Sequence, residues 1–393
     1  MKSRLSVLII GVALCCLAAL VIGAVFVFKQ PTQSLPASQT ASLVASSPSA
    51  EPITRVTLAP GVQPGPHCRF GITAPYSITG YDLEALGVGA LLDWSAQPPA
   101  DLPAQIEFIR VLRLRDDLFP QMLAGLSQLV AQSPGAFWEV GNEPDTSYED
   151  QDNLPAEVFA QRYYQVALQI RTLDPSAKIG FGAVVQPTPL RLRYLQRAWD
   201  ELLSLAGSRA AASALIDFWN VHAFILNETP DGWGTGVPPG FSADFADAVI
   251  IDSSPYLETH SNPLFERRVI DFRQWMASIG EQDKELWITE YGSLFPPLDP
   301  PAGRDLINVS DEETTRFMLA SFDFLLTAVD PALGMPGDGG RLVQRWFWYS
   351  LNDYRHHFGG SLYDPDQNKA ITPVGRAFAG YLASLPLDLE YCP

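Results

Sequence analysis

Two glutamates that end apolar segments are the residues of this chain best placed to do chemistry. Glu143 lies near the end of "FWEVGNEPD" (137–145), and Glu290 lies near the end of "ELWITEYG" (285–292). A carboxylate at the end of an apolar strand costs free energy unless a partner or a reaction uses it. Two carboxylates on either side of one bond are the groups that hydrolyse glycosides. The question is therefore whether the fold brings Glu143 and Glu290 together.

Eight short apolar segments follow residue 65, and most later ones are separated by segments of helical periodicity. Strand–helix alternation indicates parallel strands with crossover helices, and eight repeats predict a single closed (β/α)₈ TIM barrel. An open doubly wound sheet is the alternative, but the turn after the first segment, "GITAPYSITG", lacks its glycine-rich phosphate signature. The predicted strands are 68–75, 87–95, 107–114, 137–144, 178–186, 216–224, 285–292 and 345–353. The predicted helices are 156–173, 189–207, 263–280, 311–329 and a last one from 374.

The early part of the barrel is irregular, because "AQPPADLPAQ" (96–105) is too short and too rich in proline for a full helix. At the other end, the last helix is expected to return the chain to the start of the first strand. Active sites of such barrels lie at the carboxyl ends of the strands. The fourth and seventh strands would therefore bring Glu143 and Glu290 to one rim.

The chain is predicted to have three parts. Residues 1–29 contain an uncharged apolar run, Leu5 to Phe28, which is long enough for a transmembrane signal anchor. A cleaved signal peptide is the alternative, although no good small-x-small exit is found. Residues 30–64, rich in Ser, Ala, Thr and Pro, are typical of a disordered linker. Residues 65–393 would form the barrel, outside the cytoplasm and attached to the membrane only through the N-terminal helix.

Composition narrows the class of partner. The formal net charge is -18, from 26 Lys+Arg and 44 Asp+Glu, so the chain repels phosphate backbones and nucleic acid is not expected as a partner. Hydrophobic residues make up 47% of the chain, which is sufficient for a large core. A neutral carbohydrate is compatible with this surface, and the barrel is expected to be monomeric.

Two cysteines lie beyond the membrane segment, Cys68 in the first predicted strand and Cys392 near the end of the chain. In an oxidising compartment they are expected to form a disulfide if the two ends of the barrel domain meet. The alternative is a pair of free thiols.

The segments "GNEP" and "ITEYG", with the aromatic "WFWYSLND" and the tail "GSLYDPDQNKAITPVGRAFAGYL", resemble the large clan of retaining glycoside hydrolases with (β/α)₈ barrels and two catalytic glutamates. The resemblance spans about 65–385. Within the clan, "GNEPD", "VHAF" and "WITEYG" most resemble the alkali-sensitive-linkage-protein-like glycosyl hydrolases, some of which act on β-1,3-glucans. The resemblance implies an O-glycoside hydrolase without cofactor or metal, acting on a β-linked poly- or oligosaccharide.

Carried over from the clan, Glu143 would be the general acid/base and Glu290 the nucleophile, with carboxyl groups about 5–5.5 Å apart. Glu143 would need a raised pKa, and Glu290 would need hydrogen-bond donors that keep it ionised. Asn142 would bind the sugar 2-hydroxyl.

Further site residues are expected around this pair. His222 ends the sixth strand, where the clan often has a His two residues before a Tyr that orients the nucleophile. Here that second position is Phe224, so the partner of the nucleophile is open between Tyr291, Tyr349 and Tyr76.

Tryptophans are expected to bind the sugar rings. Trp348 would form the stacking platform on the eighth strand, with core packing as the alternative. Trp94 and Trp233, the latter in "DGWGTG", would line outer subsites.

Two other functions are compatible with the same residues. A carbohydrate-binding surface protein could keep the barrel without catalysis, and Phe224 favours it while the retained pair of glutamates opposes it. A transglycosylase would use the same intermediate with a sugar hydroxyl in place of water.

Overall fold

The structure is a computed structural model, and it describes residues 54–55, 67–147, 150–228, 234–242, 260–295, 309–353 and 355–385. The predicted membrane segment (1–29) lies outside these residues, as does the predicted linker (30–64) apart from 54–55. In the described ranges, no helix combines the length and the apolar character needed to span a bilayer.

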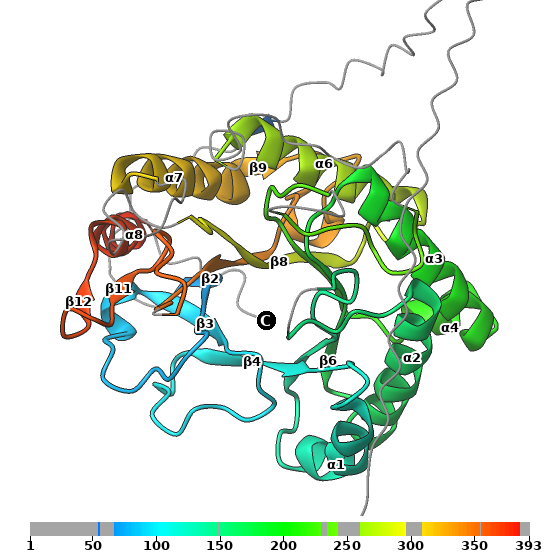
Figure 1. The fold of residues 1–393 in the computed structure, drawn as a ribbon. Helices are drawn as coiled ribbons and strands as arrows, with labels where there is room; N and C mark the ends of the chain where they lie inside the picture. Colours follow the sequence, from blue (N-terminus) through cyan, green and yellow to red (C-terminus); the bar gives the residue numbers. More distant parts are fainter. Residues whose placement is uncertain are drawn as a thin grey trace, which may run out of the picture. The chain divides into compact units, whose positions relative to one another are not determined.

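Eight parallel strands close into a barrel, as the sequence predicts (Figure 1). Each predicted strand is present, and neighbours in the sequence are neighbours in the barrel, with the last strand closing on the first. The barrel strands are β2 (His67–Thr73), β3 (Val88–Leu92), β4 (Glu107–Leu112), β5 (Phe137–Val140), β6 (Lys178–Val184), β7 (Phe218–His222), β8 (Glu285–Gly292) and β10 (Arg345–Tyr349). Two antiparallel pairs lie outside it, β1 (Thr54–Arg55) with β9 (Ala328–Val329) and β11 (Tyr363–Asp364) with β12 (Ala370–Ile371).

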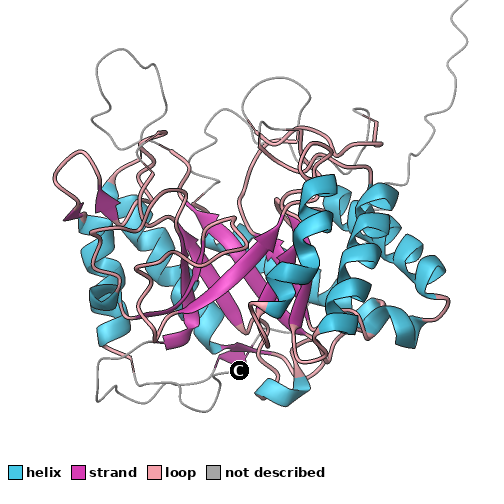
Figure 2. Ribbon diagram, turned by 90° about the horizontal axis from the view of Figure 1, so that it is seen from below, coloured by secondary structure: helices cyan, strands magenta, loops and turns pink. Residues whose placement is uncertain are grey.

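Helices flank the strands on both sides in the view of Figure 2. The five predicted helices are confirmed, and α7 begins with the capping box of Ser310 and Glu313. The connections from β2 to β3 and from β3 to β4 contain no α-helix. The first contains only a short 3₁₀ turn, and the second includes 96–105, where no full helix is expected. The helical elements are η1 (Glu84–Leu86), α1 (Phe119–Ala131), α2 (Ala156–Leu173), α3 (Pro189–Ala206), α4 (Arg209–Ser213), α6 (Asn262–Ser278), α7 (Asp311–Thr327), η2 (Pro336–Asp338) and α8 (Pro373–Ala383).

Sequence periodicity does not predict α1, since only two of its side chains, Leu126 and Val130, are buried. The last helix returns to the start of the first barrel strand, as predicted. The ring Nε2 of His67, at the start of β2, lies 3.1 Å from the carbonyl oxygen of Leu382 in α8.

The ends of the predicted disulfide are described only in part. Cys68 is the one cysteine among the described residues, and it is disulfide-bonded. Cys392 lies outside the described residues, so its pairing with Cys68 stays a prediction.

An aromatic plug fills the amino-terminal half of the barrel. The rings of Phe218 and Trp287 stack with centroids 3.9 Å apart, and Phe137 lies 5.2 Å from Trp287. Below them the Arg345 guanidinium lies 4.8 Å from the Trp287 ring and pairs with Glu107 at 2.5 Å. The barrel is therefore closed from below, and any ligand must enter from the carboxyl ends of the strands.

Glycines make room for this plug. A Cβ atom on Gly180 would lie 2.3 Å from the Phe218 ring, and one on Gly71 would lie 2.2 Å from Phe347. Neither distance is compatible with a larger side chain while the rings keep their places.

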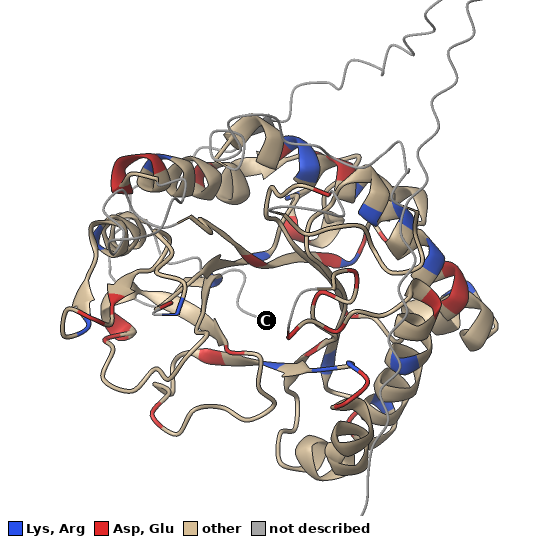
Figure 3. Cartoon of the chain, viewed as in Figure 1, with Lys and Arg blue, Asp and Glu red and all other residues tan. Residues whose placement is uncertain are grey.

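Charged residues of both signs lie on the helices around the barrel (Figure 3). Some helical arginines are instead buried, and among them Arg191 of α3 ties together the loops that follow β5 and β7. Its guanidinium binds the carboxylate of Asp145, and its Nε lies 2.9 Å from Glu228. It also donates to the Gly236 carbonyl at 2.9 Å. Two loops at the carboxyl ends of the strands are thus held by one cation.

Replacing Arg191 with Met should lower the free energy of unfolding by about 3–5 kcal/mol, because two buried carboxylates lose their cation. Urea unfolding of the full chain measures this loss. Arg197→Met on the same helix is the control, since the Arg197 side chain is 43% exposed and pairs with the 38% exposed Glu157. The control should lose about 0.2–1 kcal/mol. Equal losses in the two variants would contradict the structural role of Arg191.

Candidate active site

A cavity of about 690 Å³ opens at the carboxyl ends of the strands. Its lining comes from every barrel strand or the loop after it, as expected for a site of this fold. Asn142, Glu143 and Glu290 are among the lining residues. The fold therefore brings the two predicted glutamates to one pocket.

Glu143 occupies an unusual backbone conformation just beyond β5. Its φ is +41°, in the left-handed region that side chains other than glycine rarely adopt. The conformation is held by its own N–H, which donates to the Ala183 carbonyl at 2.9 Å. The preceding N–H, of Asn142, donates to the buried carboxylate of Asp152 at 2.8 Å. Strain that is fixed this firmly is typical of a functional position.

Glu290 faces the cavity because β8 is irregular. Along a regular strand, side chains alternate between the two faces. Trp287 points into the barrel, so Thr289 and Tyr291 would follow it and Glu290 would point outward. The register shifts instead, since Val221 pairs with Ile288 but His222 pairs with Glu290. This bulge turns Glu290 into the pocket and sends Tyr291 to the outer side.

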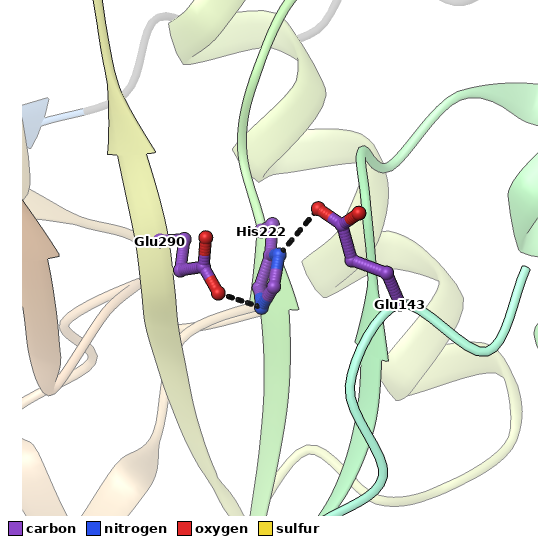
Figure 4. A group of neighbouring side chains, drawn as sticks. All are labelled: Glu143, His222 and Glu290. Carbon is purple, nitrogen blue, oxygen red and sulfur yellow. Dashed lines mark hydrogen bonds and ion pairs between the residues drawn. The ribbon is translucent and has the colours of Figure 1, made fainter. Parts of the chain in front are cut away.

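His222 stands between the two glutamates (Figure 4). Its Nδ1 lies 2.9 Å from Oε1 of Glu143, and its Nε2 lies 3.3 Å from Oε1 of Glu290. One oxygen of each glutamate and one ring nitrogen lie within 4.8 Å of one another. The imidazole is fully buried. His222 therefore positions both carboxylates from below and is not itself exposed to a substrate.

Glu139 is a third carboxylate at the site, which the sequence analysis did not single out. It lies on β5 four residues before Glu143, is fully buried, and has no hydrogen-bond partner for either oxygen among the described residues. Its nearest charged neighbour is His222, with Nε2 at 3.9 Å from its Oε1. The inward position of Glu139 is predictable from strand alternation, because Phe137 and Glu139 lie on the same, inward face of β5.

The hydrogen-bond donor to Glu290 is Trp94, a residue that the sequence predicts in an outer subsite. Its indole Nε1 lies 2.8 Å from Oε1 of Glu290 and 2.9 Å from Oδ1 of Asn142. Trp94 lies in the pocket and contacts both Glu290 and Asn142, so the prediction of an outer subsite is wrong.

The predicted role of Tyr291 is also wrong. Its ring is fully buried outside the barrel wall and packs 5.1 Å from Phe265, and its hydroxyl accepts from Ser321 at 3.2 Å. Tyr349 and Tyr76, the other two candidates, do line the cavity. The Tyr349 hydroxyl donates to Asp353 at 2.9 Å.

Trp348 does not form a sugar platform. Along β10 the inward residues are Arg345, Phe347 and Tyr349, so Trp348 points outward, where its ring packs against Tyr291 and its Nε1 donates to Gly360. Its side chain is fully buried. The residue of β10 that lines the cavity is Tyr349, beside Trp94 and Phe224, with ring centroids 6.0 and 6.1 Å away.

Two further predicted residues have different outcomes. Asn142 lies in the pocket, where its Nδ2 donates to Gln151 at 2.6 Å. Trp233 lies outside the described residues, and its place in a subsite stays a prediction.

Burial and crowding of like charges control protonation at the site. Burial, together with the neighbouring charges of Glu143 and Glu139, raises the pKa of Glu290 to about 8, although His222 and the Trp94 hydrogen bond act to lower it. Burial lowers the pKa of His222, but the carboxylates of Glu290, Glu139 and Glu143 outweigh it and hold this pKa well above its ordinary value. The raised pKa of Glu290 opposes the expectation that this carboxyl group stays ionised. The cluster keeps protons that isolated side chains would release.

Glu143, His222 and Glu290 are also the residues whose ligand atoms converge enough to be considered for a metal ion in the described part of the chain. The two nitrogens of His222 are turned toward different carboxylates. One ion could take only one of these nitrogens, and it would have to displace the 2.9 Å contact with Glu143 to use Nδ1. The arrangement fits proton sharing better than metal binding.

Comparison with known proteins supports the fold. A scan of protein-family models finds no match, and neither does a search of curated proteins. Among solved structures, a monomeric β-xylosidase from Caulobacter crescentus matches with a TM-score of 0.52 at 14% identity, over 83% of this chain and 69% of that one. A glucosidase from Croceicoccus marinus matches with a TM-score of 0.50 at 13% identity, over 86% and 72%.

A third similar structure is a GH128 (subgroup VI) exo-β-1,3-glucanase from Aureobasidium namibiae. It matches with a TM-score of 0.50 at 10% identity, over 80% of this chain and 97% of that one. At these identities the likeness concerns the fold alone. The chain has the (β/α)₈ barrel that these glycoside hydrolases also have.

The protonation of the cluster predicts that the free energy of unfolding falls as the pH rises from about 5 to about 8. The folded pKa of Glu290, about 8, lies above its ordinary 4.5, so the folded chain holds a proton that the unfolded chain has lost in this window. His222, also raised, acts in the same direction above its ordinary 6.5. Each such proton contributes a slope of at most about 1.4 kcal/mol per pH unit.

Urea unfolding at several pH values compares the wild type with Glu290→Gln. The variant cannot bind the extra proton, so its stability should depend less on pH. An equal or steeper dependence would contradict the raised pKa of Glu290.

Proposed function

We propose that this protein is a retaining O-glycoside hydrolase that acts on a β-linked poly- or oligosaccharide. The observation that carries the proposal is the pair of buried glutamates in one open pocket, with carboxylate oxygens within 4.8 Å of each other. Retaining glycosidases have carboxyl groups about 5–5.5 Å apart, whereas inverting ones leave about 6.5–9.5 Å for a water.

In the first step, the Glu290 carboxylate attacks the anomeric carbon while the bond to the leaving oxygen breaks. Glu143 gives its proton to that oxygen, and a covalent glycosyl-enzyme results. In the second step, Glu143 removes a proton from water, the water oxygen attacks the anomeric carbon, and Glu290 is released as a carboxylate. The first step needs Glu143 as a carboxylic acid and Glu290 as a carboxylate.

His222 reconciles this requirement with the raised pKa of Glu290. A proton held on Glu290 in the free protein must reach Glu143 before the first step. A neutral His222 with its proton on Nδ1 can accept the Glu290 proton at Nε2, 3.3 Å away, and the resulting imidazolium can release its Nδ1 proton to Glu143, 2.9 Å away. The number of protons in the cluster does not change. Burial keeps a proton on the cluster, and His222 transfers it from Glu290 to Glu143.

The pocket lining supports a carbohydrate ligand. Aromatic side chains such as Trp94, Tyr349 and Phe358 stand beside polar ones such as Asn142 and Arg113. Aromatic faces bind the C–H surface of sugar rings, while polar groups bind hydroxyls. The volume of about 690 Å³ fits an oligosaccharide segment better than a macromolecular surface. A β-glucan is the substrate that we would test first, on the resemblance of the sequence.

A carbohydrate-binding protein on the same barrel is the second candidate. Two observations favour it: Phe224 stands where the clan carries a tyrosine, and the pKa of Glu290 is raised. Calorimetric binding of an oligosaccharide without any turnover between pH 4 and 9 would support this function instead. A transglycosylase would release a longer oligosaccharide in place of reducing sugar.

Glu290→Ala should reduce turnover of an aryl β-glycoside by at least about 10⁴-fold, because the covalent intermediate cannot form. Azide should restore part of the turnover and yield the α-glycosyl azide, since it enters from the face that the carboxylate occupied. The full chain is screened on β-1,3-, β-1,4- and mixed-linkage glucans, xylan and mannan, and the products are analysed by NMR.

The matched control is Glu285→Ala, a glutamate at the amino-terminal end of the same strand, which should retain activity. Turnover by Glu290→Ala at the wild-type rate would refute the nucleophile. A β-azide product from that variant would refute the retaining mechanism.

We also propose that residues 1–29 anchor the barrel outside the cytoplasm and that Cys68 pairs with Cys392. The full chain should sediment with membranes and resist carbonate extraction, whereas a 30–393 chain should not. Peptide mapping without reduction should recover Cys68 and Cys392 as one linked pair. A soluble full chain would exclude the anchor, and Cys68 linked elsewhere would exclude the bridge.

A further inference from the structure

One hydrogen-bond donor reaches two site residues at once. The indole of Trp94 has a single N–H, which lies 2.8 Å from Oε1 of Glu290 and 2.9 Å from Oδ1 of Asn142. An indole N–H can donate but cannot accept. It therefore favours the charged form of a carboxylate that it contacts, and it fixes that carboxylate relative to Asn142.

The backbone of Trp94 is held in a conformation that a bulky residue rarely adopts. Its φ is +58°, in the left-handed region. The turn is fixed by Asp93, whose Oδ1 accepts from the N–H of Ser95 at 3.0 Å and from its Oγ at 2.6 Å. The Ser95 carbonyl in turn accepts from the Val111 N–H at 2.9 Å. These hydrogen bonds hold Trp94 in a strained backbone conformation from which its ring reaches Glu290. Backbone strain that is held in this way is typical of a functional position.

No tyrosine hydroxyl takes this role in the described structure. The expected position carries Phe224, which has no donor. The hydroxyl of Tyr291 lies outside the barrel wall beside Ser321, and that of Tyr349 donates to Asp353. Trp94 supplies the hydrogen bond to Glu290 instead.

The charged and titratable groups that face Glu290 come from three strands or their loops. Glu139 and Glu143 oppose its charge from β5 and the loop after it, and His222 favours it from β7. Tyr349 of β10 is coupled to it as well, since the negative charge of Glu290 contributes to the raised pKa of that phenol. Trp94 is the uncharged donor in this set, so its effect on Glu290 can be separated from theirs by substitution.

We propose that Trp94 is a positioning residue that orients Glu290 and stabilises its ionised form, in place of a tyrosine on the strand that carries His222. The inference rests on the proposed function for its kinetic consequences, but the effect on Glu290 exists whether or not the protein is an enzyme. Through Asn142, the same N–H also couples the nucleophile to the residue that would bind the sugar 2-hydroxyl.

Trp94→Phe keeps a ring and removes the donor. We expect kcat/KM to fall about 10–100-fold, the loss of one hydrogen bond to a charged group. The acidic limb of the kcat/KM profile should move to higher pH by about one unit, because the carboxylate loses its donor. A residue that only shapes the pocket would change KM and leave this limb in place.

Trp275→Phe is the matched control. It also removes one indole hydrogen bond to a side-chain oxygen, 2.9 Å to Gln196, but on helix α6 away from the pocket. Its rate and pH profile should match the wild type. Trp94→Leu, which removes ring and donor together, repeats the test if the Phe variant does not fold.

A second readout does not need activity. Carbon-13 NMR of the glutamate carboxyl groups in the full chain, labelled at Glu and assigned with Glu290→Gln, follows the titration of Glu290 directly. The pKa of Glu290 should be higher in Trp94→Phe than in the wild type and Trp275→Phe. An unchanged or lower pKa, or an unmoved acidic limb, overturns the proposal. If no glycan is hydrolysed by the wild type but the NMR shift occurs, the proposed function fails and the role of Trp94 stands.

Discussion

The contact between one buried imidazole and the carboxylates around it is the interaction on which the site depends. His222 faces Glu143 through one ring nitrogen and Glu290 and Glu139 through the other. Three carboxylates cannot be buried together as three anions without a large desolvation penalty and mutual repulsion. A cationic imidazole offsets part of that repulsion, and retained protons offset more. The chemistry of the pocket follows from this shared charge, because a site that must keep protons has an acid available beside a base.

The barrel makes this burial possible. Its lower half is filled by stacked aromatic rings, so water reaches the carboxylates only from the open rim. Strand alternation then selects which side chains enter the interior, and the two strands that carry Glu139 and His222 obey it. Glu290 is the exception, because a bulge in β8 is needed to turn it inward. The same bulge explains why Tyr291, its neighbour, belongs to the outer core.

The loops above the strands need support of their own. Arg191 binds a carboxylate from the loop after β5, and a carboxylate and a carbonyl from the loop after β7, with its side chain fully buried. Asp152 accepts from the backbone beside Glu143 and from Leu114 after β4. These buried ion pairs and caps hold the strained backbone of Glu143 and the rim of the pocket.

The barrel and the strand-end positions of its two glutamates follow from the order of residues alone. Eight apolar segments with helical segments between them leave few ways to bury both faces of the strands, and every predicted strand is found. The segment "GNEPD" and the segment "ITEYG" place their acids at strand ends, which parallel strands bring to one rim. Strand periodicity also places Glu139 on the inward face of β5 and Trp348 on the outward face of β10.

The contacts between these groups depend on the folded structure. The bulge in β8 could not be read from residue types, because it depends on the register with β7 and β10. The hydrogen bond from Trp94 to Glu290 joins residues from different loops, and a left-handed backbone at a tryptophan has no sequence signal. The protonation of Glu290 is likewise a property of its neighbours, since burial and adjacent charges set its pKa. The sequence specifies which titratable side chains are present, but the surroundings that folding creates set their pKa values.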